Sequence, residues 1–219
     1  MSPRDLFDGP VVELPFGYRV GKRIFDLASA LLAFAVVLPI LVVAGLLVWI
    51  FMGRPILFRQ PRPGLNERVF DVLKLRTMSD AVDRDGKLLP DDQRLCRLGR
   101  VLRKTSIDEL PQLINVIRGE MSLVGPRPLL KEYLPHYTAR ERLRHRVKPG
   151  ITGLAQVNGR NSLKWEERLE WDAIYATSAS WRSDLLILVK TVGRVLSGRG
   201  TDAAPEHPGP LHKYRGQQR

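Results

Sequence analysis

The longest apolar run of the chain covers residues 27–52 and contains no charged side chain. At 1.5 Å per residue, a helix of this length would extend about 39 Å, whereas the hydrocarbon core of a bilayer is roughly 30 Å thick. Pro39 lies near its middle, where proline removes a backbone hydrogen bond and kinks a helix. Basic residues flank both ends of the run: Arg19, Lys22, Arg23, Arg54, Arg59 and Arg62.

Two membrane topologies fit this pattern. One is a single spanning helix. The other is a hairpin that bends at Pro39 and re-emerges, which would keep both basic flanks on the cytoplasmic side, as the positive-inside rule favours. The residues alone leave both topologies open.

The shorter patterns beyond this run predict a small β element and several helices. Extended segments are expected at 56–58 and 68–75, separated by a turn, and residues 81–92 should form a polar loop. Helices are expected at 94–104, 107–118, 165–175 and 181–196. The first of these has alternating apolar and basic positions, a pattern that suits either an interfacial helix in an anionic membrane or an ordinary surface helix. From residue 198 on, the chain is rich in Pro, Gly and charge, which predicts disorder.

The charge of the chain indicates an anionic partner. The formal net charge is +12 and the pI is near 10.3, which suits nucleic acid, anionic lipid or a phosphorylated substrate. A nucleic-acid-binding module would interleave aromatic residues with its basic ones, but residues 74–127 contain no Phe, Trp or Tyr. The single cysteine, Cys96, excludes an internal disulfide and fits a reducing compartment.

Asp108 and Glu109 form an adjacent acidic pair in this basic chain, and a proline-flanked arginine, Arg127, follows. A structural interpretation is available, since Ser106 and Glu109 have the spacing of a capping box and Asp108 would favour a helix N-terminus. Such a helix start would lower the pKa of Asp108 and direct N–H groups at an anion.

The same pair also suits chemistry on phosphate. An ionised carboxylate can attack phosphorus or hold Mg²⁺ against phosphate oxygens. Arginine and lysine side chains would neutralise a diphosphate. The candidate phosphate-binding residues are Lys74, Arg76, Arg103 and Arg127.

Several short motifs follow one another along the chain. Residues 22–26 read KRIFD, 58–60 read FRQ, with Arg62 and Gly64 following, and 74–78 read KLRTM. Residues 102–113 read LRKTSIDELPQL, 119–128 read GEMSLVGPRP, and 148–160 read KPGITGLAQVNGR. In this order the motifs resemble the bacterial sugar transferase family, whose members are monotopic polyprenyl-phosphate phosphoglycosyl transferases, and the chain is expected to be a minimal, small form. Leu38 departs from the Ser that often precedes the proline in that family.

The resemblance implies a reaction and roles for residues. A sugar 1-phosphate would pass from a UDP-sugar to undecaprenyl (polyprenyl) phosphate, with release of UMP, as the first membrane step of glycoconjugate, exopolysaccharide or lipopolysaccharide assembly. Asp108 would be the nucleophile that carries a phosphosugar, assisted by Glu109, and the two carboxylates would hold Mg²⁺. Gln156 and Arg160 are expected near the nucleotide.

The resemblance also implies a domain organisation. It favours the hairpin, so both flanks of the apolar run, and the catalytic domain, should lie at the cytoplasmic face of the bacterial inner membrane, in contact with anionic headgroups. The expected fold is α+β and mainly helical, with a tail (1–21), a re-entrant helix broken at Pro39 (22–53), a catalytic domain (54–200) and a disordered tail (201–219).

Other functions fit less well. A membrane scaffold would leave the acidic pair unexplained, and a phosphatase would hydrolyse the same phospho-aspartate with water. The sugar, the pathway, the polyprenol length and the oligomeric state do not follow from the sequence.

Overall fold

The computed structural model describes residues 14–159, 163–197 and 210–216. The strands are β1 (Leu57–Pro63), β2 (Val69–Leu75), β3 (Ser122–Val124) and β4 (Gly150–Thr152). The α-helices are α1 (Phe16–Met52), α2 (Asp91–Arg94), α3 (Arg97–Lys104), α4 (Gln112–Arg118), α5 (Ala139–Arg142), α6 (Leu154–Asn158), α7 (Trp165–Ser178), α8 (Trp181–Ser197) and α9 (Leu211–Gly216). Short 3₁₀ segments are η2 (Leu65–Glu67), η3 (Ile107–Glu109), η4 (Lys131–His136) and η5 (Leu143–Arg146). The expected α+β, mainly helical fold is confirmed.

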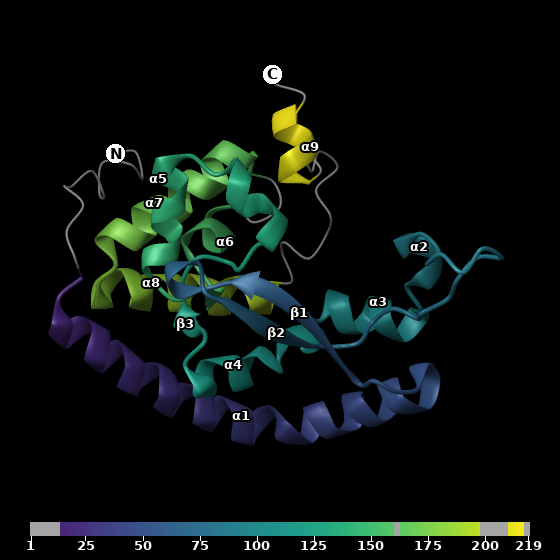
Figure 1. Ribbon diagram of the computed structural model, residues 1–219. Helices are drawn as coiled ribbons and strands as arrows, with labels where there is room; N and C mark the ends of the chain where they lie inside the picture. The colour runs from purple at the N-terminus through teal and green to yellow at the C-terminus, as the bar shows by residue number, and fades with distance from the viewer. Residues whose placement is uncertain (1–13, 160–162, 198–209, 217–219) are drawn as a thin grey trace.

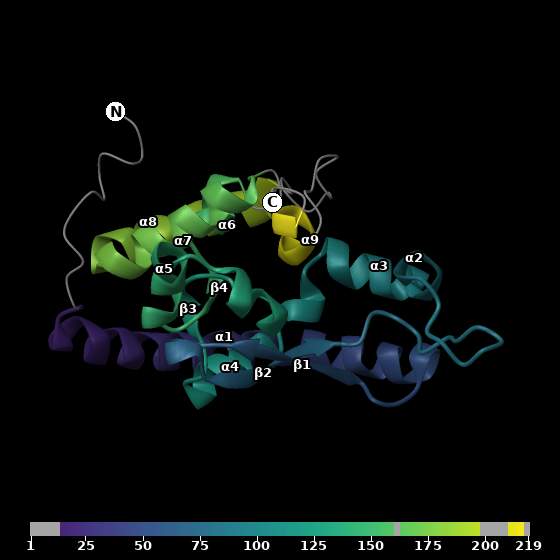
Figure 2. The ribbon, with the colours of Figure 1, turned by 45° about the horizontal axis from the view of Figure 1, so that its top comes forward.

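Helix α1 is long, gently curved and lies along one side of the remaining elements (Figures 1 and 2). Among the described residues it is the one helix long and apolar enough to cross a membrane. Its N-terminal half packs on α4 and β3, and its C-terminal half contacts α3. Many of its large apolar side chains are exposed, including Leu32 at 70% and Phe51 at 70%. Helix α1 therefore has an apolar face that the other described residues leave exposed.

The predicted break at Pro39 is absent from the secondary structure, because α1 continues through it. The buried or half-buried positions on one face of α1 recur every three or four residues on both sides of the proline: Ala30, Ala33, Val37, Leu41, Ala44 and Val48. This periodicity is that of one continuous helix face. Packing against the domain thus keeps a single helix where the family resemblance predicted a helix broken at Pro39, while Pro39 itself is exposed. The re-entrant topology stays a prediction.

The first strands form an antiparallel hairpin, as predicted, in which Leu57 pairs with Leu75 and Pro63 with Val69. Asn115 of α4 fixes this hairpin to the helix beneath it. Its amide accepts a hydrogen bond from the Leu73 N–H at 3.0 Å and donates to the Asp71 carbonyl at 2.7 Å. These two bonds therefore fix the position of Lys74, near the end of β2, relative to α4.

The second sheet is a short parallel pair, β3 and β4, which the sequence did not predict. It joins the segment before Arg127 to the segment that follows Pro149. The closeness of the two backbones requires glycine, since a Cβ added at Gly125 would lie 2.3 Å from the carbonyl oxygen of Lys148. This pairing fixes the start of the segment that follows β3, residues 125–128, which is called the Arg127 turn below.

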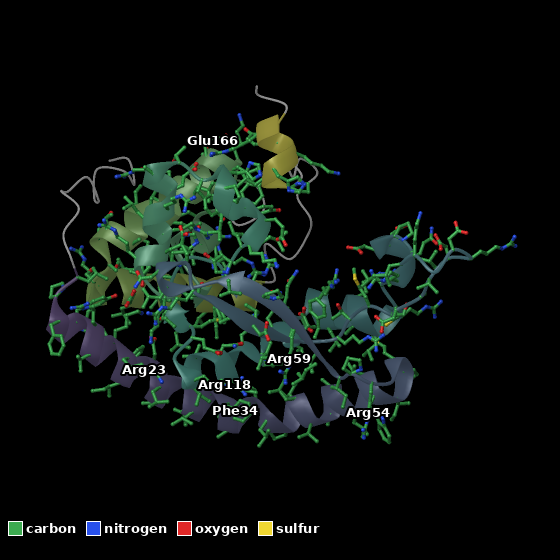
Figure 3. All side chains as sticks on the ribbon, in the orientation of Figure 1. Arg23, Phe34, Arg54, Arg59, Arg118 and Glu166 are labelled. Atoms are coloured by element: carbon green, nitrogen blue, oxygen red, sulfur yellow. The ribbon has the colours of Figure 1, made fainter. Side chains whose placement is uncertain are left out.

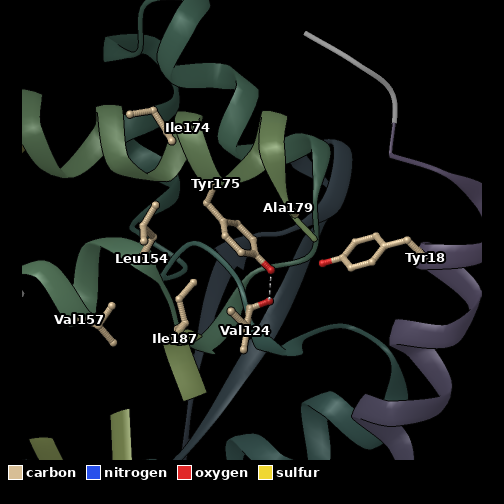
Figure 4. Packing of buried hydrophobic residues seen from close by; sticks show 8 residues of the cluster. All are labelled: Tyr18, Val124, Leu154, Val157, Ile174, Tyr175, Ala179 and Ile187. Atoms are coloured by element: carbon tan, nitrogen blue, oxygen red, sulfur yellow. Dashed lines mark hydrogen bonds between the residues drawn. The ribbon is translucent and has the colours of Figure 1, made fainter. Parts of the chain in front are cut away.

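A buried cluster anchors the N-terminal end of α1 to α7, α8 and β3 (Figure 4). Its polar centre is Asp184, which accepts hydrogen bonds from the hydroxyls of Tyr18 at 2.8 Å and Tyr175 at 2.7 Å. Lys22 completes it through an ion pair with Asp184 at 2.8 Å. The expected helices at 165–175 and 181–196 are confirmed as α7 and α8.

The predicted disorder of the C-terminal tail is wrong for residues 211–216, which form α9. Leu211 is fully buried in a cluster with Leu129, Tyr133 and Trp165. Arg215 donates to the carboxylate of Glu141 at 2.5 Å. The buried leucine, this ion pair, and hydrogen bonds from Arg215 to the His136 carbonyl and from Tyr214 to Glu166 stabilise this short helix. A segment of six residues is too short to show a hydrophobic period. Residues 198–209 and 217–219 lie outside the described part of the chain.

Candidate active site

The predicted acidic pair and all four predicted phosphate-binding residues line one cavity of about 950 Å³. The cavity lies between the β1–β2 hairpin, the segment after it, α3 and the Arg127 turn. Its basic lining residues are Arg59, Lys74, Arg76, Arg94, Arg103 and Arg127, and its acidic ones are Asp80, Asp91, Asp108 and Glu109. Folding therefore gathers charged residues that are up to 68 positions apart in sequence, from Arg59 to Arg127.

Glu109 is held by two cations. Its Oε1 accepts from Lys74 Nζ at 2.7 Å and from Arg127 Nη2 at 2.5 Å, and Arg127 Nη1 lies 3.3 Å from Oε2. Burial alone would raise the pKa of Glu109, but the attraction of Arg127 and Lys74 outweighs it and lowers the pKa well below its usual range. Glu109 is therefore a fixed anion that orients both cations.

Asp108 has a different environment although it is the next residue. It is 7% exposed, and no other side chain within the described residues donates a hydrogen bond to its carboxylate. Burial and the adjacent Glu109 charge raise the pKa of Asp108, while Lys74 and Arg103 oppose the rise. The prediction that a helix start would lower this pKa is thus wrong. Asp108 is the carboxylate of the pair that remains available for chemistry.

The local backbone explains this difference between the expected and observed helix start. Residues 107–109 form a 3₁₀ turn, and α4 begins only at Gln112, after Pro111. Ser106 has a positive φ of 56° and makes no side-chain cap, so the predicted capping box does not form. Pro111 therefore precedes the first turn of α4, where its missing N–H is not needed. The predicted end of this helix at Gly119 is confirmed.

Arg76 lines the cavity, but four of its five N–H donors are already used. It donates to the carbonyls of Met52 and Arg54, at 3.2 and 3.1 Å, and to that of Met78 at 2.9 Å. It also pairs with Asp80 at 2.5 Å. This geometry favours a structural role in which Arg76 ties the C-terminal end of α1 to the site, over the predicted phosphate contact.

Arg103 reaches the cavity from α3. Its Nε donates to the hydroxyl of Thr77 at 3.0 Å. The helix lies very close to the segment after β2, since a Cβ added at Gly99 would lie 1.9 Å from the carbonyl oxygen of Thr77. Thr77 was not singled out as a site residue, although its place directly after Arg76 in the KLRTM motif was a usable signal.

Of the two predicted nucleotide-binding residues, the one that the structure describes, Gln156, is not brought into this cavity. Gln156 lies on α6, and its side-chain nitrogen and oxygen are buried without a hydrogen-bond partner among the described residues. Its backbone carbonyl is 3.4 Å from Arg194 of α8. Gln156 is absent from the lining residues of the cavity, and Arg160 lies outside the described residues.

Other residues of the site were not predicted. Arg59 and Arg94 add positive charge at the cavity wall. Figure 3 labels Arg59 on β1, and Arg23 and Arg54 near the two ends of α1. Arg62 was quoted only as part of a motif; burial and the nearby Arg127 lower its pKa to about 10. The FRQ motif was a usable signal for Arg59 and Arg62, whereas nothing in a sequence this basic marks Arg94.

The chain was compared with known proteins. The sequence model described as "Bacterial sugar transferase" matches residues 17–198. The chain is 50% identical over 179 residues to "Uncharacterized sugar transferase EpsL" of Bacillus subtilis, covering 82% of this chain and 89% of that protein. It is 38% identical to "Exopolysaccharide production protein ExoY" of Sinorhizobium fredii, covering 83% of this chain and 88% of the relative.

A third relative has a more specific name. It is the "UDP-glucose:undecaprenyl-phosphate glucose-1-phosphate transferase" of Caulobacter vibrioides, to which this chain is 41% identical over 199 residues, covering 86% of this chain and 74% of that protein. The family match spans α1, the acidic pair and every basic residue of the cavity. The chain belongs to the bacterial sugar transferase family.

Proposed function

We propose that this protein transfers a sugar 1-phosphate from a UDP-sugar to polyprenyl phosphate and releases UMP, with Asp108 as the nucleophile. The single observation that carries the proposal is the environment of Asp108. Its carboxylate lies in a cavity with Lys74, Arg103 and Arg127, while its neighbour Glu109 is already paired. The names of the relatives support the substrates, since one acts on UDP-glucose and undecaprenyl phosphate by name.

The reaction would proceed in two displacements at one phosphorus atom. A carboxylate oxygen of Asp108 attacks the sugar-bearing phosphorus of the UDP-sugar, and the bond from that phosphorus to the bridging oxygen breaks, so UMP leaves. An oxygen of polyprenyl phosphate then attacks the same phosphorus and displaces the Asp108 carboxylate. Lys74, Arg103 and Arg127 would neutralise the negative charge that otherwise repels an attacking anion.

Of the two carboxylates, only that of Asp108 is well suited to bind a magnesium ion. Mg²⁺ prefers hard oxygen ligands and usually takes one or two carboxylates together with substrate phosphates and water. Asp108 offers such oxygens, whereas both oxygens of Glu109 accept from cations. Within the described residues no group of three or more His, Cys, Asp or Glu side chains could form a closed metal cage. When bound, Mg²⁺ would supply positive charge to the diphosphate, and Asp108 would be its main protein ligand.

The arrangement of α1 supports a membrane location with the site on the cytoplasmic face. Both ends of α1 contact the same catalytic domain, through Arg23 at one end and through Arg76 at the other. Arg23 donates to the carbonyl of Val116 at 2.6 Å, in the domain's helix α4. An exposed apolar face between two anchored ends suits a helix that enters and leaves the same leaflet. Exposed arginines of α3 would meet anionic headgroups.

The test is UMP release from a panel of UDP-sugars, with undecaprenyl phosphate and Mg²⁺, by the purified protein in detergent. We expect turnover with at least one UDP-sugar and none after chelation with EDTA, restored by added Mg²⁺. Without acceptor, the intact protein should gain the mass of one sugar phosphate. Asp108→Asn should lose turnover and the mass gain, because an amide is a far weaker nucleophile.

Asp71→Asn is the matched control, since it makes the same change on an exposed position of β2 outside the cavity. It should turn over normally. Full activity of Asp108→Asn would exclude the nucleophile assignment, and formation of free sugar 1-phosphate in place of the lipid product would favour a phosphatase.

A further inference from the structure

The Arg127 turn has few backbone donors with which to hold its shape. Prolines on both sides of Arg127 have no N–H group, so the turn must be fixed mainly through its carbonyl oxygens. The Pro126 carbonyl accepts from Gly150 N–H at 2.9 Å. The next carbonyl, that of Arg127 itself, accepts from Arg144 Nη2 at 2.6 Å. These two bonds fix the backbone from which the Arg127 side chain reaches Glu109.

Arg144 is itself held with unusual rigidity. It is 2% exposed, and its guanidinium contacts three groups at once. Asp172 of α7 accepts from its Nη2 at 2.7 Å and from its Nε at 3.2 Å, and the Tyr137 hydroxyl accepts from its Nη1 at 3.1 Å. The planar fork of arginine makes this set of contacts possible, and a lysine could not reproduce it.

We propose that Arg144, held by Asp172, is a positioning residue that sets the location of Arg127 in the active site. A buried ion pair is a costly way to stabilise a fold, because both charges lose their hydration. Here the pair fixes the Arg127 carbonyl, to which no backbone N–H of the described residues donates. Arg144 and Asp172 are absent from the lining residues of the cavity, so their effect must pass through Arg127.

The proposal rests on the proposed function only for its kinetic test. In the transferase assay, Arg144→Lys should lower kcat by about a hundredfold, the size of effect that a displacement of about 1 Å can produce, with a smaller change in KM. The decisive readout is a double-mutant cycle. If Arg144 acts through Arg127, Arg144→Lys should cost little further activity in an Arg127→Ala background.

A binding test does not depend on turnover. Affinity for inorganic pyrophosphate, measured by calorimetry, should fall in Arg127→Ala and by a comparable factor in Arg144→Lys. The matched control is Arg140→Ala, which breaks an exposed 2.7 Å ion pair to Glu170 of the same helix α7. It should leave kcat, KM and pyrophosphate affinity unchanged. Where Arg144→Lys does not fold, Tyr137→Phe removes one of the three contacts and should show a smaller loss in the same direction.

Two results would overturn the proposal. One is a folded Arg144→Lys variant with normal pyrophosphate affinity. The other is an equal loss of activity in the presence and absence of Arg127, which would indicate a general loosening of the fold. A wild-type protein that binds pyrophosphate but releases no UMP would instead contradict the proposed function.

Discussion

The adjacent carboxylates of Asp108 and Glu109 have pKa values that their surroundings shift in opposite directions. Both are largely buried, yet the pKa of Asp108 is raised by burial and by the Glu109 charge, while two ion pairs lower the pKa of Glu109. Pairs of titratable groups that are pushed apart in this way commonly divide the work of a site between them. This difference supports the proposal that Glu109 orients the two cations and that Asp108 is the residue that reacts.

Arg127 is the cation that links this pair to the rest of the site. Arg127→Ala should lower kcat by about 10²- to 10³-fold, the usual loss for one preorganised electrostatic contact. UMP release under saturating substrate measures this effect. Arg118→Ala, at an exposed position at the end of α4, is the control and should be near wild type. Equal rates of UMP release for the two variants would exclude a contribution of Arg127 to catalysis.

His145 is a buried imidazole whose ring nitrogens have no hydrogen-bond partner among the described residues. Burial, and then the charges of Arg144 and Arg142, lower its pKa from 6.5 to about 3. Glu67 lies 3.6 Å from Nδ1, but its side chain is 35% exposed and its attraction is too weak to offset these effects.

Between those two pKa values the unfolded chain therefore binds a proton at His145 that the folded chain does not. The free energy of unfolding should fall as the pH drops from about 6.5 towards 3, by up to about 1.4 kcal/mol per pH unit. Denaturant unfolding at several pH values, compared with His145→Gln, measures this contribution. Parallel pH profiles for the two proteins would contradict it.

At the scale of elements, the sequence predicted what depends on local pattern. The apolar run, the β1–β2 strands, α7 and α8 each have several turns or alternations of their own. The sequence missed β3 and β4, because each has three residues and they pair across 28 positions, from Ser122 to Gly150. It also could not show that two donors of Arg76 are used by carbonyls at and just after the end of α1. Both the β3–β4 pairing and the contacts of Arg76 depend on segments that are distant in sequence, and local pattern does not show which of these pack together.

Helix α9 is the element for which the prediction was most wrong, and it can be tested directly. Leu211→Ala should destabilise the protein by about 2–5 kcal/mol, since it removes a fully buried leucine from a packed cluster. Lys213→Ala on the exposed side of α9 should change stability by less than about 0.5 kcal/mol. Thermal unfolding in detergent compares them. Indistinguishable melting temperatures would mean that α9 is not docked in solution.

At the scale of the whole molecule, the domain lies along α1 from end to end (Figures 1 and 2). We expect Val20→Cys and Arg54→Cys, each in a Cys96→Ser background, to react with a membrane-impermeant thiol reagent from the same side of inverted inner-membrane vesicles. Both positions are exposed and flank the apolar part of the helix. Labelling from opposite sides would establish a spanning helix.

The way α1 packs also has a practical consequence. It contributes side chains to three of the four hydrophobic clusters among the described residues, through Tyr18 in one, Ala30 in the second and Ala44 and Val48 in the third. We therefore expect that cutting the chain after Met52 would not give a water-soluble enzyme, because the loss of α1 would expose the buried apolar side chains that it covers. Preparations for screening inhibitors will have to keep the membrane helix and a detergent or bilayer around it.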